Sequence, residues 1–144
     1  MQNKAANIKT SMGDWAEKQA LKLLLDHGFQ TLECNYHSRY GEIDLIVRRD
    51  QELIFVEVKA RSMTKFGQAH EVVSMSKQRK IIKTALHYLE INSELSDLYC
   101  RFDVICFDFK QQFAKTVQHN FSEFSYDLNW IENAFTFDQE FINL

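Results

Sequence analysis

Two carboxylates and a lysine lie in neighbouring apolar stretches of the sequence, where they could bind a divalent cation. The segment GEIDLIVRRDQELIFVEVK, residues 41–59, contains two runs rich in Ile, Leu, Val and Phe. Asp44 belongs to the first run, Glu57 belongs to the second, and Lys59 follows two residues later. A hairpin that turns between the runs, just after Asp50, places Asp44 opposite Glu57.

Like charges that face each other across two strands repel, so the two carboxylates need compensation. One interpretation is a structural ion-pair cluster with Lys59 and Arg61. The other is a bound Mg²⁺ or Mn²⁺, because both ions prefer oxygen ligands and keep part of their hydration shell. Lys59 beside such an ion could orient a water molecule and neutralise charge on a phosphate. The spacing alone permits a phosphodiester-cleaving site without requiring one.

Alternation along the predicted hairpin divides its residues between two faces. One face is wholly aliphatic and is predicted to be core: Ile43, Leu45, Val47, Ile54, Val56 and Val58. The other face carries Asp44, Glu57 and Lys59 at the end away from the turn. Glu42 shares this polar face, where it could assist a metal or pair with Arg61.

The elements around the hairpin predict an α/β fold. A first helix is predicted in SMGDWAEKQALKLLLDHGF, where Asp14 can cap the first turn, Glu17 completes a capping-box-like pair, and Gly28 ends the helix. Strands are predicted in FQTLECNYH and LYCRFDVICFDF, and a second helix from Ser74 or Ser76 to Ile91. This order predicts a mixed β-sheet flanked by helices, in which the crossover makes the fourth strand parallel to a neighbour.

The length and composition favour a single domain over residues 1–144. We expect residues 1–12 to be flexible and the aromatic, acidic segment at about 122–144 to form a strand and a packed tail. No apolar run approaches the roughly 18 residues of a membrane span, and the first residues do not resemble a signal peptide. The expected location is therefore cytoplasmic, with no membrane partner.

Charge is distributed unevenly along a chain of net charge −3. Residues 59–83 contain seven Lys and Arg residues and one Glu, whereas residues 108–144 contain two Lys and six acids. The basic segment could form a face that meets an anion, or it could be an ordinary solvated helix face. Lys77 and Arg79, at the start of the second predicted helix, are candidate phosphate contacts.

The remaining reactive residue types favour structural interpretations. The three cysteines lack a CxxC spacing and lie in apolar surroundings, so buried reduced thiols are expected. The five histidines are scattered without ligand spacing. Asp103 in RFDVI is expected to pair with Arg101 or another basic group.

Several blocks occur in the order found in a known family: WAEKQALKLLLDHGF, NYHSRYGEIDLIVRRD, FVEVKARS, FGQAHEVVSMSKQRKI, ALHYL, RFDVI and WIENAF. The sequence resembles the YraN-like family of uncharacterised bacterial proteins, whose fold is similar to that of restriction endonucleases and archaeal Holliday-junction resolvases. Asp44, Glu57 and Lys59 match the catalytic signature of the PD-(D/E)XK nucleases. In related resolvases a glutamate of the first helix joins the metal site, and Glu17 occupies the matching position.

The resemblance implies a restriction-endonuclease-like fold and a Mg²⁺- or Mn²⁺-dependent endonuclease that acts on branched or otherwise structured DNA. Asp44 and Glu57 would bind the metal, Lys59 would position the water, and Glu17 would complete the site. The expected nucleic-acid contacts are Arg61, Lys65, Lys77 and Arg79. Symmetric cutting of a junction would call for a homodimer. Two alternatives stay open: a nucleic-acid-binding module without cleavage activity, and an interaction protein that uses its acidic, aromatic tail.

Overall fold

The chain folds into a five-stranded mixed sheet between two helices. The computed structural model describes residues 10–62, 73–113 and 118–137. The elements in chain order are α1 (Met12–Asp26), β1 (Gln30–Ser38), β2 (Gly41–Arg49), β3 (Glu52–Arg61), α2 (Met75–Ile91), β4 (Tyr99–Phe109) and β5 (Tyr126–Phe135). Short 3-10 turns at Ser93–Leu95 and Phe121–Glu123 precede the last two strands. Neither described helix is long and apolar enough to cross a membrane.

The strands lie in the order β1-β2-β3-β4-β5, so strands that follow one another in the chain are neighbours in the sheet. All neighbouring pairs are antiparallel except β3 and β4, which are parallel and are connected through α2. The prediction of an α/β protein with a mixed sheet is therefore confirmed, as is the predicted crossover. The second helix begins within the predicted range, because the Ser74 side chain caps it by accepting a hydrogen bond from the Lys77 backbone N–H.

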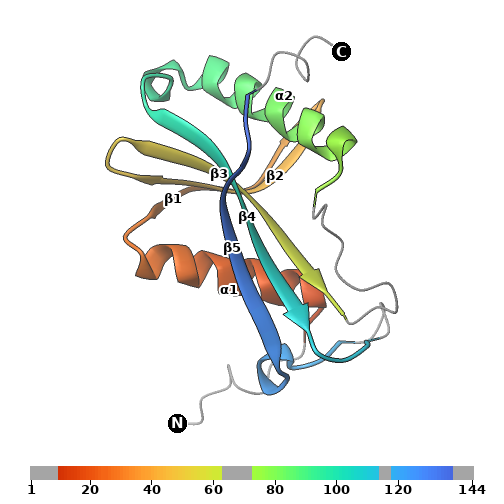
Figure 1. Ribbon diagram of the computed structural model, residues 1–144. Coiled ribbons are helices and arrows are strands. Elements are labelled where there is room, and N and C mark those ends of the chain that lie inside the picture. Colours follow the sequence, from red (N-terminus) through yellow and green to blue (C-terminus); the bar gives the residue numbers. More distant parts are fainter. Residues whose placement is uncertain (1–9, 63–72, 114–117, 138–144) are drawn as a thin grey trace.

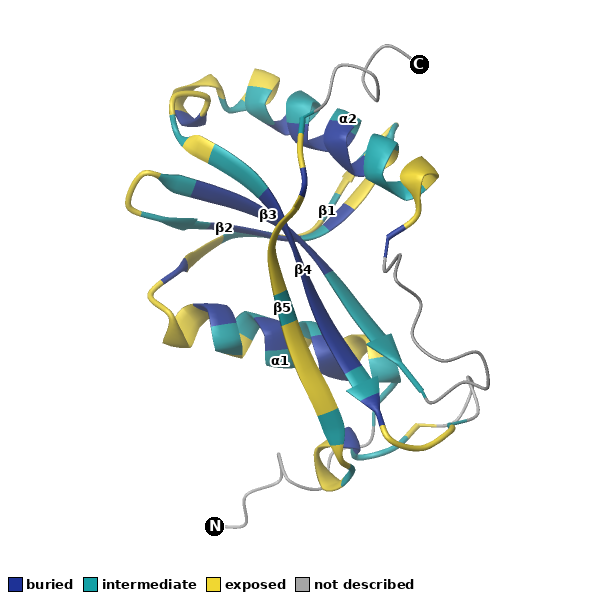
Figure 2. Ribbon diagram, in the orientation of Figure 1, coloured by how far each residue is buried: buried dark blue, intermediate teal, exposed yellow. Residues whose placement is uncertain are grey.

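The two helices cover opposite faces of the sheet (Figure 1). The α1 face of the core contains Trp15, Ala16, Ala20, Leu24, Leu45, Val47, Ile54, Val56, Ile105 and Phe107. The α2 face contains Ile43, Ile46, Leu53, Phe55, Ile81, Ile82, Ala85, Tyr88, Phe102 and Val104. Both sides of the central strands are therefore buried, as Figure 2 shows for β3 and β4.

The predicted aliphatic face of the hairpin is mostly confirmed, with one error. Leu45, Val47, Ile54 and Val56 lie together on the α1 side, but Ile43 belongs to the α2 side. The neighbouring strand β1 is irregular here, because its register shifts between Thr31 and Glu33 and Asn35 has a φ of 53°. Strict alternation therefore does not extend through this part of the hairpin.

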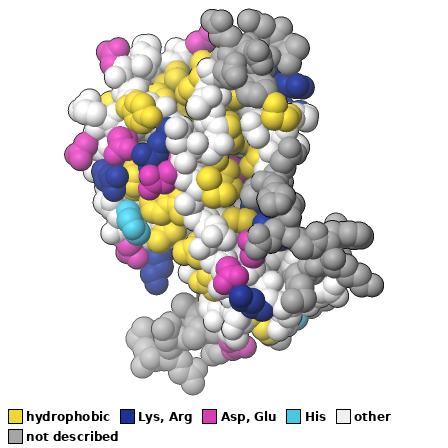
Figure 3. Space-filling model, in the orientation of Figure 1, with side chains coloured by type: hydrophobic (Ala, Val, Ile, Leu, Met, Phe, Trp, Pro, Cys, Tyr) yellow, Lys and Arg dark blue, Asp and Glu magenta, His cyan; other side chains and the backbone are white. Residues whose placement is uncertain are grey.

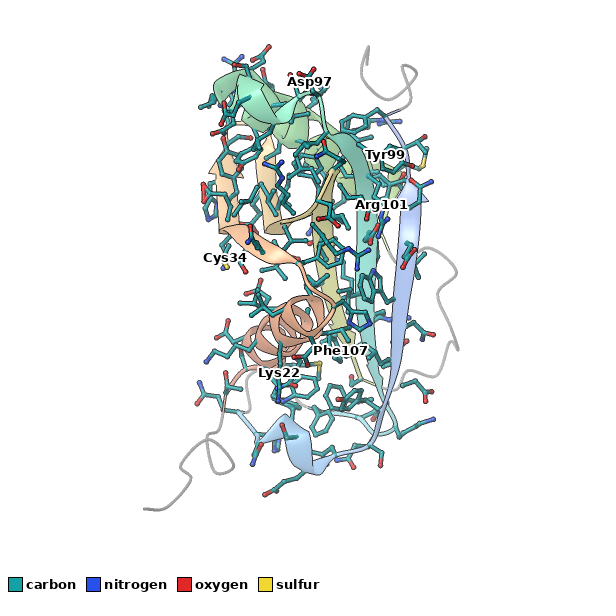
Figure 4. The ribbon with its side chains drawn as sticks, turned by 90° about the vertical axis from the view of Figure 1, so that its left-hand side faces the viewer. Lys22, Cys34, Asp97, Tyr99, Arg101 and Phe107 are labelled. Carbon is teal, nitrogen blue, oxygen red and sulfur yellow. The ribbon has the colours of Figure 1, made fainter. Side chains whose placement is uncertain are left out.

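Several local predictions need correction. Ser11, not Asp14, is the N-cap of α1, and its hydroxyl accepts a hydrogen bond from the Asp14 backbone N–H. Glu17 is therefore not part of a capping box. Cys34 is exposed at the outer edge of β1 (Figure 4), while Cys106 is buried as predicted. Residues 1–9 lie outside the described part of the chain, but Thr10 pairs with His119 through two backbone hydrogen bonds.

The C-terminal segment contributes an edge strand. In Figure 2 β5 is mostly exposed, and its Leu128 and Ile131 are among the exposed large hydrophobic residues. Figure 3 shows acidic and basic side chains interspersed with hydrophobic ones on the face seen there. Residues 138–144 of the predicted tail lie outside the described part of the chain.

A buried polar network fastens β5 to β4. Asp103, whose side chain is fully buried, pairs with Arg101 at 3.0 Å, which confirms the predicted partnership. Asp103 also accepts hydrogen bonds from the Trp130 indole N–H and from the Asn133 backbone N–H, each at 2.9 Å. Figure 4 shows Arg101 on β4, on the side next to β5. The network satisfies a buried charge, so its role is structural.

Candidate active site

Strands β2 and β3 separate beyond the last pair of their ladder. The predicted hairpin register is confirmed from Arg49–Glu52 at the turn to Leu45–Val56. Beyond that pair, β2 continues against β1 while β3 continues against β4 to Arg61. We call this point of separation the fork. Figure 1 shows that it opens on the side where both helices begin.

Asp44 lies on β2 at the fork and interacts with the backbone of β3. Its Oδ2 atom accepts a hydrogen bond from the Val58 backbone N–H at 2.8 Å. The ladder of β2 and β3 has ended one pair earlier, so this carboxylate oxygen satisfies a donor on the separating strand. Asp44 is part-buried and holds a fixed position relative to β3.

Glu57 on β3 is the buried carboxyl group of the site, with only 4% of its surface exposed. Burial raises the pKa of Glu57 to about 8, and the adjacent Asp44 carboxylate adds to this increase. The positive charges of Lys77 and Lys59 oppose it. The raised pKa means that burial penalises the charged form of Glu57, and a cation bound there would favour that form.

Glu17 on α1 joins Asp44 from the other layer of the fold. Burial raises the pKa of Glu17, and both the charge of Asp44 and a hydrogen bond shared with Asp44 raise it further. A hydrogen bond from Asn35 lowers it. Glu17 also lines a pocket of about 340 Å³, open to solvent, between α1 and strands β1 and β2. We call Glu17, Asp44 and Glu57 the carboxylate cluster.

Two lysines supply positive charge from different elements. Lys59 extends from β3 two residues beyond Glu57, and its charge lowers the pKa of Glu57. Lys77, in the first turn of α2, has its Nζ atom 3.2 Å from Glu57 Oε2. Burial lowers the pKa of Lys77, but the charges of Glu57 and Asp44 give a net increase. The sequence predicted Lys77 only as a phosphate contact, whereas in the structure it lies beside Glu57 of the carboxylate cluster.

The other predicted nucleic-acid contacts, Arg61 and Arg79, have different local surroundings. Arg61 makes a bidentate pair with Asp108, with Nε–Oδ1 and Nη2–Oδ2 distances of 2.8 and 3.2 Å. Arg79 is half-buried, and its Nε atom has no hydrogen-bond partner. Lys65 lies outside the described part of the chain. The Arg61 guanidinium is therefore committed to β4, and Arg79 is the better candidate for an external anion.

Glu42 does not pair with Arg61, the basic partner that the sequence offered for it. It is exposed and lies 3.2 Å from His37 Nδ1 on the paired strand β1. The Arg61 partner proposed for it is bound to Asp108 instead. Glu42 is thus an acidic residue of β2, two positions from Asp44, that stands outside the carboxylate cluster.

The carboxylate cluster has features of a cation site, although it is not a closed one. Within the described ranges, no group of three or more His, Cys, Asp and Glu side chains is arranged to hold a metal ion. Asp44 and Glu57 nevertheless offer oxygen atoms side by side, and Glu57 Oε2 is buried without a hydrogen-bond partner. Two carboxylates that leave the other coordination positions to water and substrate suit Mg²⁺ better than a complete protein cage would.

Two site residues lacked a clear signal in the sequence. Asn35 interrupts β1 with a left-handed backbone conformation, which Asn tolerates better than most residues. Its appearance within a predicted strand was the available clue. Lys77 could have been placed by following the crossover, because α2 must begin on the side of the sheet where β3 ends.

The fold and the site together define an α/β protein with a carboxylate–lysine cluster where two central strands separate. The chain belongs to UPF0102, an uncharacterised protein family whose model matches residues 16–107. That segment contains all the carboxylate-cluster residues and both lysines. The membership predicted in a family of uncharacterised bacterial proteins is thereby confirmed.

Three relatives from the same family align with this chain over most of their own length. A UPF0102 protein of Acinetobacter baumannii strain AYE is 60% identical over 131 residues, which is 91% of this chain and 98% of the relative. One from Acinetobacter baylyi is 57% identical, over 87% of this chain and 89% of the relative. One from Saccharophagus degradans is 40% identical, over 88% and 94%. Their names state the family and no activity.

Proposed function

We propose that this protein is a metal-dependent endonuclease with a restriction-endonuclease-like fold, which hydrolyses phosphodiester bonds in branched or otherwise structured DNA. The observation that carries the proposal is the convergence of Glu17, Asp44 and Glu57 with Lys59 at the fork. These residues come from α1, β2 and β3. A group of like charges that includes the buried Glu57 costs stability, so its presence favours a functional role, and Glu17 lines a pocket that is open to solvent.

Asp44 and Glu57 would hold Mg²⁺ or Mn²⁺. The bound ion would supply Lewis-acid charge that makes a water molecule more acidic and neutralises charge on the phosphate. Lys59, two residues beyond Glu57 on β3, would orient the attacking water and donate to a phosphate oxygen. The water oxygen would form the new bond to phosphorus and lose a proton to solvent, while the bond to the leaving sugar oxygen breaks and that oxygen takes a proton from solvent. Glu17 would accept a hydrogen bond from this water through the side open to the pocket.

A non-cleaving nucleic-acid-binding module is the second candidate. It is favoured by the contact between Lys77 and Glu57, because an ammonium 3.2 Å away partly compensates the carboxylate without any metal. On this account the cluster would be a structural site beside a DNA-binding surface on α2. The two candidates differ in whether the carboxylates are required for bond breaking.

Incubation of linear, single-stranded, flapped and four-way DNA with Mg²⁺ or Mn²⁺ tests the proposal. We expect cleavage of at least one structured substrate by the wild type and its loss in Glu57→Gln. Glu42→Gln is the matched control, because it removes an acid from β2 outside the cluster and should cleave normally. If the wild type binds these substrates and cuts none, the binding module is the better account. Equal cleavage by wild type and Glu57→Gln would place the active site elsewhere.

A further inference from the structure

The contact between Lys77 and Glu57 joins α2 to β3 at the fork, beyond the apolar core in which Tyr88 of α2 packs against Phe55 of β3. Lys77 stands in the first turn of α2, and Glu57 stands on β3 at the fork. The Nζ–Oε2 distance is 3.2 Å, within the range of an ion pair. The lysine side chain is 40% exposed, whereas the glutamate side chain is 4% exposed. Only the lysine therefore has a direct path into solvent.

The geometry of this contact leaves the glutamate oxygen available to another cation. Glu57 Oε2 is buried and makes no hydrogen bond of good geometry, so the Lys77 ammonium 3.2 Å away compensates it mainly through charge. Asp44, by contrast, is fixed by the Val58 backbone N–H through Oδ2. A cation that lies between Asp44 and Glu57 would need an oxygen that Lys77 now approaches.

Two cations cannot share this position at low cost. A divalent ion on Glu57 would lie within several ångströms of the Lys77 ammonium, and like charges at such distances repel strongly in a partly buried site. The ion offers twice the charge and can be held by both carboxylates. Lys77 loses its attraction to Glu57 and Asp44 when it leaves, but its side chain, which is already 40% exposed, regains hydration.

We propose that Lys77 is an internal counter-ion that occupies the charge position of the divalent cation and is displaced from Glu57 when the cation binds. The inference rests on the proposed function insofar as it takes Asp44 and Glu57 to bind a metal. It adds that, in the metal-free protein, Lys77 of α2 compensates the charge of Glu57 on β3. Metal occupancy would thus control whether the α2 lysine is held in the site or released toward solvent.

Metal affinity measured by calorimetry provides the first test. Mg²⁺ is titrated into wild type, Lys77→Met and Lys80→Met at about pH 8.5, where competition by protons at carboxyl groups is small. Removal of the competing ammonium should tighten Mg²⁺ binding by about tenfold or more. Lys80 lies on the same helix and is exposed, so Lys80→Met removes the same charge without the contact and should change affinity by less than about twofold.

Lysine acylation of the wild type provides a second test that needs no substitution. Mass spectrometry would compare the modification rates of Lys77 and Lys80 with and without Mg²⁺. Displacement predicts a rate increase at Lys77 on adding Mg²⁺, while Lys80 stays unchanged. This readout holds even if Lys77→Met fails to fold.

The outcomes separate failure of this inference from failure of the metal site. If wild type and Lys77→Met bind Mg²⁺ equally and acylation of Lys77 does not respond, the counter-ion role is wrong while the metal site stands. If neither protein binds Mg²⁺, both the metal site and the displacement are wrong. If Lys77→Met binds Mg²⁺ and the wild type does not, the result would support competition between Lys77 and the metal ion.

Discussion

Asp44 accepts a hydrogen bond from the Val58 backbone N–H at 2.8 Å, and it does so where the ladder between β2 and β3 has ended. The same carboxylate contacts both glutamates of the carboxylate cluster. Asp44 therefore has two opposite effects on the metal-free protein. It satisfies a backbone donor, and it brings a negative charge against two others.

Substitutions at Asp44 should separate these effects. Asp44→Asn keeps an oxygen that can accept from Val58 and removes the repulsion, so the metal-free protein should be as stable as wild type or slightly more stable. Asp44→Ala removes the acceptor as well and should cost about 1–3 kcal/mol. Urea unfolding of the two variants measures the difference. A large loss of stability in Asp44→Asn would instead indicate that the charge is needed by a basic partner.

The raised pKa of Glu57 predicts a specific pH dependence of stability. The folded-state pKa of about 8 lies above the ordinary value of 4.5, so folding favours the protonated carboxyl group. This contribution is fully present below pH 4.5 and is lost as the pH rises toward 8. The free energy of unfolding without metal should therefore fall between these pH values. Glu57→Gln, which cannot ionise, should show a flatter profile in urea titrations, and a profile identical to wild type would contradict the assignment.

The sequence predicted the hairpin register because two apolar runs flank one polar turn, and that pattern leaves few alternatives. It also predicted the parallel pairing of β4, since a helix between two strands favours a crossover. It did not predict the fork. Alternation assumes that paired strands stay together, whereas the β2–β3 ladder ends at Leu45–Val56, beside the position where Asn35 makes β1 irregular.

The site was predicted less completely than the fold for a related reason. Asp44, Glu57 and Lys59 are close in sequence, so a local hairpin argument could bring them together. Lys77 reaches Glu57 only through the packing of α2 on the sheet, which no local pattern encodes. Ser11 and Asp14 are both residue types that cap helices. Because Ser11 is the N-cap, Glu17 is not part of a capping box and its side chain interacts with Asp44 instead.

Asp103 should be far more important for stability than any member of the carboxylate cluster. It is fully buried and bound by Arg101, Trp130 and the Asn133 backbone. Asp103→Ala leaves Arg101 with its 2.7 Å pair to Glu52 but removes the acceptor of the Trp130 and Asn133 N–H groups, so it should cost about 3–5 kcal/mol. Hydrogen exchange should show lost protection first in β5. Protection equal to wild type in β5 would mean that the network does not hold the edge strand.

The predicted DNA contacts should now divide into two groups. Arg61 is bound to Asp108, so Arg61→Ala should lower stability with little effect on the salt dependence of DNA binding. Arg79 has an unpaired buried Nε atom and no acidic partner among the described ion pairs. Arg79→Ala should weaken binding to all DNA sequences alike and reduce the salt slope by about one. Filter binding at several salt concentrations measures both, and unchanged binding by Arg79→Ala would move the DNA surface elsewhere.

Lys59 should act on the reaction more than on binding. It lies two residues beyond Glu57 on β3, and its charge acts on that carboxyl group. Lys59→Ala should bind DNA nearly as wild type, yet lose roughly 100-fold or more in single-turnover cleavage at saturating metal, the effect of removing one positioned electrostatic group. Lys80→Ala controls for loss of charge outside the site. Lys59→Arg keeps the charge but replaces a compact ammonium with a planar guanidinium, so cleavage at the wild-type rate by this variant would show that charge suffices and that Lys59 does not position the water.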